Sequence, residues 1–362
     1  MKNCAIIQIE SIHEIVTPGI IHSLNSIGYK PILFFNKGCS ERRGNIFEYC
    51  DNLDFELVEF KLREGYSIQK LKEDMHESKC EFVVVNTLQK NDRLHSYEEL
   101  DLPLIGIVHN VNIFLQSEIG LQFTERPNTF LLTIASHVSL FLRSKLSFDK
   151  TNIDYYVPSY LINDKDLTKK QFSPSSTTTL AIAGGVNNIR NRGFSELLNF
   201  LRSSEVDYNV KFLICGGGID RVRLEKFVER YELQNYFDFV EVDETTGYVM
   251  YDKYYNALSN ADFLLTLFPP KDIKYFKYKA TASIMTAISI GLPIITDIAA
   301  RTIYGVPCLA YENDKMETLF KCISDVNEES YHTLQERTIN YRDENRLRSI
   351  TTFEQAINSF TV

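Results

Sequence analysis

No segment of this 362-residue sequence is expected to carry it into or through a membrane. Its longest nearly uncharged run, residues 283–296, is interrupted by Gly291 and Pro293 and is shorter than the ~18–20 apolar residues of a membrane-spanning helix. The N-terminus lacks the long apolar stretch and small-residue cleavage site of a signal peptide. We therefore expect a cytoplasmic protein.

Closely spaced cysteine pairs are also missing from the sequence. The seven cysteines are an odd number without any C-x-x-C spacing, which disfavours both a disulfide framework and a zinc ribbon. They are expected to be reduced and mostly buried thiols. The histidines away from the predicted strand ends show no H-x-x-x-H or Cys/His spacing, so no metal site and no resident cofactor are predicted.

Positive charge is in deficit, with 39 Lys and Arg against 48 Asp and Glu and a net charge of -9. Nucleic-acid binding, which needs a surplus of cations for phosphate contacts, is therefore disfavoured. Neither a G-x-G-x-x-G fingerprint nor a P-loop is present, which argues against an NAD-dependent dehydrogenase. The 44% hydrophobic content is typical of a folded protein, and the length suits two domains.

Short apolar runs alternate with helix-like stretches along the chain, a pattern typical of parallel α/β sheets. We predict an α/β protein with two Rossmann-like domains that face each other across a cleft. The first would span residues 1–160 and the second 175–345, with a C-terminal helix over 346–362 that crosses back to the first. The predicted strands are 4–9, 30–35, 55–60, 81–85, 104–108 and 129–134, followed by 179–183, 211–215, 237–242, 262–267 and 293–296.

Two glycine clusters follow strands of the second domain, at Gly184-Gly185 and at Gly216-Gly217-Gly218. Because ligands of such sheets bind beyond the carboxyl ends of the strands, these turns could hold a phosphate through backbone N–H groups. Arg190 and Arg192 follow the first cluster, and guanidinium groups suit phosphate oxygens. Tight structural turns and solvated surface arginines are the alternative interpretation.

A second predicted anion site lies just before an apolar helix that ends at Gly291. Lys277 and Lys279 would supply positive charge there, and Thr281 or Ser283 would cap the helix. The backbone N–H groups of Thr281, Ala282 and Ser283 would then face the sheet edge.

The order and spacing of these motifs resemble the GT-B glycosyltransferases, most nearly the retaining, nucleotide-sugar-dependent family 4. The first glycine loop with Arg192-Gly193, the second glycine turn and residues 278–295 resemble the family's donor-binding motifs. The sequence departs from the family where its paired glutamates fall on Tyr278 and Thr286. The family's usual arginine after the first glycine falls on Val186.

The resemblance implies further site residues. His109 would be catalytic or would contact the donor sugar, and the nucleoside would be bound near Glu241, Val242 and Thr286. The acceptor would be bound by loops after the first and fourth strands, which contain Glu10, His13 and Asn86.

The function predicted from these features is transfer of a sugar from a nucleotide-diphosphate sugar, with UDP or GDP as the nucleotide, without a metal ion. The acceptor would be a carbohydrate or a lipid-linked carbohydrate in bacterial polysaccharide or glycoconjugate assembly. The partners would include weak peripheral contact with the inner face of the membrane. A catalytically inactive GT-B-like binding subunit, motivated by the missing glutamates, and a sugar-nucleotide epimerase are the alternatives.

Overall fold

The first domain is built on a sheet of seven parallel strands. The structure is a computed structural model that describes residues 1–61, 67–88, 97, 99–116, 118–146, 152–161, 171–187, 193–204, 208–268 and 273–361. The strand order is β3-β2-β1-β4-β5-β6-β7. The strands are β1 Lys2–Gln8, β2 Tyr29–Asn36, β3 Glu56–Phe60, β4 Cys80–Val85, β5 Leu104–Val108, β6 Thr129–Thr133 and β7 Ile153–Tyr155.

The second domain is built on a sheet of six strands, also parallel, in the order β10-β9-β8-β11-β12-β13. In both sheets the first strand of the domain is third in the order. The next two strands extend the sheet on one side of it, and the chain then returns to extend the sheet on the other side. The strands are β8 Thr178–Ile182, β9 Val210–Ile214, β10 Phe237–Phe239, β11 Phe263–Leu265, β12 Ile294–Asp297 and β13 Leu309–Tyr311.

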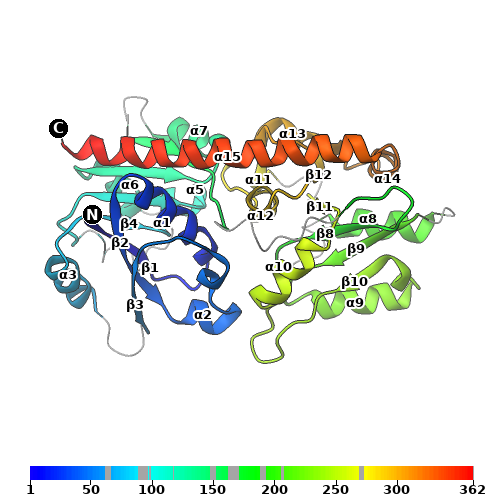
Figure 1. The fold of residues 1–362 in the computed structure, drawn as a ribbon, viewed down its shortest axis with the longest axis horizontal. Coiled ribbons are helices and arrows are strands. Elements are labelled where there is room, and N and C mark those ends of the chain that lie inside the picture. The colour runs from blue at the N-terminus through cyan, green and yellow to red at the C-terminus, as the bar shows by residue number, and fades with distance from the viewer. Residues whose placement is uncertain are drawn as a thin grey trace.

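Helices cover both sheets (Figure 1). Those of the first domain are η1 Glu14–Val16, α1 Thr17–Ser26, α2 Gly38–Arg43, η2 Ile46–Tyr49, α3 Ile68–Glu77, α5 Val111–Leu115, α6 Glu118–Glu125 and α7 Ser136–Lys145. Those that follow are α8 Phe194–Ser203, α9 Arg221–Arg230, η5 Gln234–Tyr236, α10 Tyr251–Ser259, α11 Lys274–Lys277, α12 Ala282–Ile290, α13 Ile298–Tyr304, α14 Glu317–Ser324, α15 Glu328–Asn358 and η6 Ser359–Thr361.

The predicted fold class, two parallel α/β domains, is confirmed. Every predicted strand is present, because central strands buried on both faces need continuous apolar runs that are visible in the sequence. The two strands that the sequence did not reveal, β7 and β13, are three residues long and lie at sheet edges. Most of their residues are only half-buried, so they lack the continuous apolar run by which the inner strands are recognised.

One helix, α15, joins the two domains along one edge of the molecule (Figure 1). Near its start, Tyr331 Oη donates to the carbonyl oxygen of Asp262, 3.0 Å away, in the second domain. Further along, Ser349 Oγ donates to the carbonyl oxygen of Val157 over 3.2 Å and Phe353 packs on Tyr156. The helix therefore runs without a break through residue 345, where the sequence predicted a domain boundary.

None of the helices in the described ranges combines the length and the apolar character needed to cross a bilayer.

Candidate functional site

The loop after β1 is held by buried amide side chains. Gln8, the last residue of β1, donates from Nε2 to the carbonyl oxygens of Glu10 and Ile12, at 2.5 and 2.8 Å. Asn86, which follows β4, donates from Nδ2 to Gln8 Oε1 and, over 3.0 Å, to the carbonyl oxygen of His13. The carbonyl groups of the loop therefore face the protein interior. Both amides are nearly inaccessible to solvent, so this loop geometry is fixed by the fold.

This loop places His13 against His109, which follows β5. The two imidazole rings stack with centroids 3.9 Å apart and planes 3° from parallel. His109 Nε2 lies 2.7 Å from the carbonyl oxygen of Asn86. A carbonyl only accepts hydrogen bonds, so Nε2 carries the hydrogen and Nδ1 is the unprotonated nitrogen of the neutral ring.

Both rings are uncharged at neutral pH. Burial, the largest cause, and the nearby charge of Lys279 together lower the pKa of His109 to about 4, against the hydrogen bond to the Asn86 carbonyl, which raises it. Burial also lowers the pKa of His13 well below its usual value, assisted by His109, Lys279 and Arg42. The pair can therefore accept or donate hydrogen bonds without attracting an anion by charge.

The second domain brings Lys279 to this pair. The backbones of Asn110 and Lys279 form an isolated antiparallel bridge, and Val111 N donates to the carbonyl oxygen of Tyr278 over 3.0 Å. The strand end that carries His109 is thus joined directly to the loop before α12. A cation of the second domain and the imidazoles of the first therefore share one junction.

The start of α12 lies next to this junction. Thr281 Oγ1 caps the helix by accepting from Ser283 N, and Thr281 N itself donates to Tyr304 Oη over 3.0 Å. Of the three predicted backbone donors, Ala282 N alone has no partner among the described residues. Ser283 Oγ donates to the carbonyl oxygen of Ala183, which ties α12 to the end of β8.

The two glycine clusters contact each other. Gly184 has a left-handed backbone conformation, φ 89°, which favours glycine. A side chain on Gly216 would collide with the carbonyl oxygen of Gly184, and one on Gly217 with that of Gly247. Val186 N also donates to the carbonyl oxygen of Gly217 over 2.7 Å. Close packing of adjacent turns thus accounts for Gly216 and Gly217, while Gly184 and Gly185 are partly accessible beside α12.

The predicted nucleoside-binding residues are not gathered at one point. Thr286 is buried in α12, with its Oγ1 3.4 Å from Tyr254 Oη. Glu241 is exposed on the loop after β10 and pairs with Lys253 over 2.7 Å, and its neighbour Val242 is half-buried. The predicted arginines Arg190 and Arg192 lie outside the described residues.

Several residues at the junction were missed from the sequence, namely Gln8, Glu14, Arg42 and Tyr251. Glu14 is buried, accepts from Arg42 at 3.1 and 3.2 Å, and also accepts from Tyr251 Oη at 2.8 Å. Gln8 could have been noticed as the polar end of an apolar strand. The others carry no local signal, because Tyr251 is 237 residues from Glu14 in the chain. Within the described ranges, no three His, Cys, Asp or Glu side chains gather as a metal ion would require.

Comparisons with known proteins find similarity in structure and not in sequence. No protein-family profile and no curated protein sequence matches the chain. Anabaena HepE, solved with UDP and glucose, superposes with a TM-score of 0.66 at 10% identity, over 99% of this chain and 100% of that one. WaaG, a glycosyltransferase involved in lipopolysaccharide biosynthesis, superposes with a TM-score of 0.58 at 13% identity, over 98% of each chain.

A Listeria monocytogenes protein assigned as a UDP-N-acetylglucosamine 2-epimerase also superposes, with a TM-score of 0.57 at 10% identity over 93% of this chain and 91% of that one. The fold is therefore common to glycosyltransferases and to a protein assigned to a different reaction, and the reaction of this chain has to be argued from the site. The two parallel sheets, their strand orders and these full-length superpositions show that the chain has the GT-B fold.

Proposed function

We propose that this protein is a glycosyltransferase that moves a sugar from a nucleotide-diphosphate sugar to a carbohydrate or lipid-linked acceptor in bacterial surface glycoconjugate assembly. The observation that carries the proposal is the junction at which Lys279 and the start of α12 meet the His13 and His109 rings. Sugar transfer needs a positively charged group, because the donor releases a negatively charged diphosphate. It also needs a group that can accept a proton, because the acceptor hydroxyl loses one.

The donor diphosphate would bind where the second domain offers positive charge and backbone N–H groups. Lys279 supplies an ammonium group, and Ala282 N lies at the positive end of α12. The accessible turn at Gly184 and Gly185 allows close approach of the backbone. Arg190 and Arg192 would complete the site. Fixed donors at this position would stabilise the charge that develops on the departing nucleotide diphosphate, UDP or GDP, without a metal ion.

In the transfer, the bond between the anomeric carbon and the diphosphate oxygen breaks, and a bond from that carbon to the acceptor oxygen forms. The resemblance to family 4 implies retention of configuration, in which case His109 would contact the donor sugar and the departing diphosphate oxygen would take the proton of the acceptor hydroxyl. If configuration is inverted, the neutral Nδ1 of His109 would accept the proton of the acceptor hydroxyl. Glu10, His13 and Asn86 would shape the acceptor side, and a lipid-linked acceptor would bring the protein to the inner face of the membrane.

One observation favours an alternative, a GT-B-like binding subunit without catalytic activity. Tyr278 and Thr286 stand where the family has glutamates, and Thr286 lies buried against Tyr254. Ribose contacts at this point of α12 would therefore need other groups, such as those near Glu241 and Val242.

The test is a thermal-shift screen against UDP, GDP, CDP, ADP, TDP and CMP, with and without divalent metal. A ligand at 100 times its Kd adds about 2.7 kcal/mol of stability. The proposal expects one nucleotide diphosphate to stabilise the protein without metal and Lys279→Ala to weaken its binding about tenfold or more. Lys277→Ala is the matched control, because this exposed lysine contacts the Phe141 ring and lies two residues away.

Analysis of the reaction products then distinguishes a transferase from an epimerase and from an inactive subunit. The corresponding nucleotide sugar, incubated with and without oligosaccharide or lipid-linked acceptors, should yield free nucleotide diphosphate and a new glycoside only when an acceptor is present. A changed sugar without any acceptor would identify an epimerase. Nucleotide binding without turnover, or no binding at all, would favour the inactive subunit.

A further inference from the structure

The two domains are joined by a buried polar contact at the edge of the junction opposite α15. The Glu14 carboxylate, 3% exposed, accepts from Arg42 of its own domain and from Tyr251 Oη of the second domain. A buried carboxylate needs such partners, because burial without them is costly. Loss of the tyrosine would thus leave one carboxylate oxygen with fewer donors.

Arg43, which follows Arg42 in α2, also contacts the second domain at this point. Arg43 Nε donates to the carbonyl oxygen of Val249 over 3.3 Å. Its guanidinium lies 4.5 Å from the Tyr251 ring centroid and 5.2 Å from that of Tyr254. Two consecutive arginines of α2 therefore hold the beginning of α10. In Figure 1 these two helices meet below the junction, while α15 crosses above it.

The two domains touch each other on both sides of His13 and His109. On one side the backbones of Asn110 and Lys279 form the isolated bridge, and on the other side Glu14 meets Tyr251. Movement of the two domains away from each other would break such contacts. Because α15 bonds to both domains at one edge, separation is easiest at the opposite edge, where Glu14 meets Tyr251.

This contact is also next to the acceptor-side loop. Glu14 directly follows His13, which has a left-handed backbone conformation, φ 68°, that is unusual for a residue other than glycine. The His13 carbonyl oxygen accepts from Asn86 Nδ2 and from Val16 N, and its ring covers His109. An anchor on Glu14 from the second domain thus constrains the residue before it.

We propose that Glu14, Arg42, Arg43 and Tyr251 form a closure latch, which holds the two domains together at this edge of the cleft. While it is engaged, the latch adds an interdomain anchor to the His13 loop, which the first domain already holds through Gln8 and Asn86. This inference rests on the proposed function for the identity of the ligand in the cleft. The latch itself is a property of the protein without ligand. Tyr251 is then a positioning residue, since it acts on His13 through Glu14.

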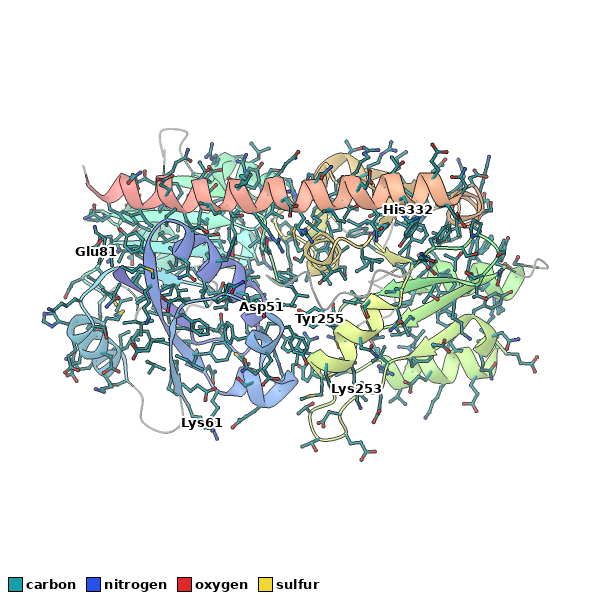
Figure 2. The ribbon with its side chains drawn as sticks, in the orientation of Figure 1. Asp51, Lys61, Glu81, Lys253, Tyr255 and His332 are labelled. Atoms are coloured by element: carbon teal, nitrogen blue, oxygen red, sulfur yellow. The ribbon has the colours of Figure 1, made fainter. Side chains whose placement is uncertain are left out.

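The test compares Tyr251→Phe with Tyr255→Phe. The first removes the hydroxyl that bonds Glu14 and keeps the ring that packs on Arg43. The second makes the same change one turn further along α10, at a buried hydroxyl that has no hydrogen-bond partner among the described residues. Figure 2 shows Tyr255 at the junction of the domains, so the control probes the same interface.

Hydrogen exchange of the ligand-free protein is the main measurement. Amides in residues 9–16 and 248–255 should exchange about tenfold faster in Tyr251→Phe, because a hydrogen bond to a buried carboxylate favours the closed state by about that factor. Exchange in β9, far from the latch, should not change, and Tyr255→Phe should match the wild type. Equal exchange in all three proteins, or acceleration throughout the chain, would overturn the proposal.

Nucleotide association gives a second measurement. In stopped-flow experiments with the nucleotide diphosphate that the screen selects, Tyr251→Phe should bind several-fold faster, because the open state is more populated. An unchanged association rate would contradict the need for latch opening. If no nucleotide binds any variant while exchange still differs, the latch stands and the proposed function fails.

Discussion

The imidazole rings of His13 and His109 lie face to face, 3.9 Å apart, at the point where the two domains of this GT-B fold meet. Protonation of either ring would place a buried charge beside the other ring and near Lys279. The arrangement is therefore compatible with neutral imidazoles only, and it makes the stability of the protein depend on pH.

The His109 pKa predicts a specific loss of stability in acid. The pKa is about 4 in the folded protein and about 6.5 in the unfolded chain, so the unfolded state binds more protons between these values. The contribution is fully present above pH 6.5 and is lost as the pH falls toward 4. For His109 alone the free energy of unfolding should fall by about 2 kcal/mol between pH 7 and pH 5.

Urea unfolding at the two pH values checks this expectation. His109→Gln should show a smaller loss than the wild type, whereas His332→Gln, at an exposed position on α15, should keep the wild-type loss. The same loss in the wild type and in His109→Gln would mean that His109 titrates normally.

Gly216→Ala should destabilise the second domain by about 1–3 kcal/mol. The added Cβ would collide with the carbonyl oxygen of Gly184, and backbone cannot give way as a side chain can. Gly185→Ala is the matched control, because its Cβ would lie 3.1 Å from the amide of the exposed Asn187 side chain and 3.5 Å from the Gly217 carbonyl oxygen, without a backbone collision.

Denaturant unfolding of both glycine variants measures the difference. Gly185→Ala should stay within about 0.5 kcal/mol of the wild type and instead weaken nucleotide binding, since the proposed function needs backbone access there. Equal stability of the two variants would show that the glycine turns are not packed as described.

Phe353→Ala should detach α15 from the first domain. Phe353 is fully buried and packs on the Tyr156 ring, 5.5 Å between centroids, so its removal should cost about 3–5 kcal/mol. Leu347→Ala, at a side chain that is 67% exposed on the same helix, should change stability by less than about 0.5 kcal/mol. Thermal unfolding followed by circular dichroism compares them, and similar midpoints would contradict a bracing role for α15.

Cys215 should not react in the folded protein, although it precedes three glycines in a pattern that could suggest a nucleophile. Burial raises its pKa to about 12, and its side chain is inaccessible. Iodoacetamide at pH 8, followed by mass mapping, should leave Cys4, Cys39, Cys80 and Cys215 unlabelled until denaturant is added. Labelling of native Cys215 would indicate that the turn after β9 opens.

The interpretation of the glycine clusters shows where sequence reasoning stops. The sequence indicated two turns that could each hold a phosphate. In the structure β8 and β9 are neighbours, so their turns meet, and Gly216 is glycine because Gly184 lies against it. Which strands are adjacent is a matter of sheet order, and strand order is not encoded in the spacing of residues along the chain.

What the sequence alone determined are the strands other than β7 and β13, the α/β class, the two-domain organisation and the residues at the strand ends. These depend on apolar runs and turn residues that act over a few positions, so they can be recognised locally. Only the tertiary structure decided that His13 stacks on His109, that Lys279 joins them, and that Tyr251 bonds Glu14. Those contacts connect parts of the chain up to 237 residues apart, and they form because sheet order and domain packing bring loops without any common pattern to one junction.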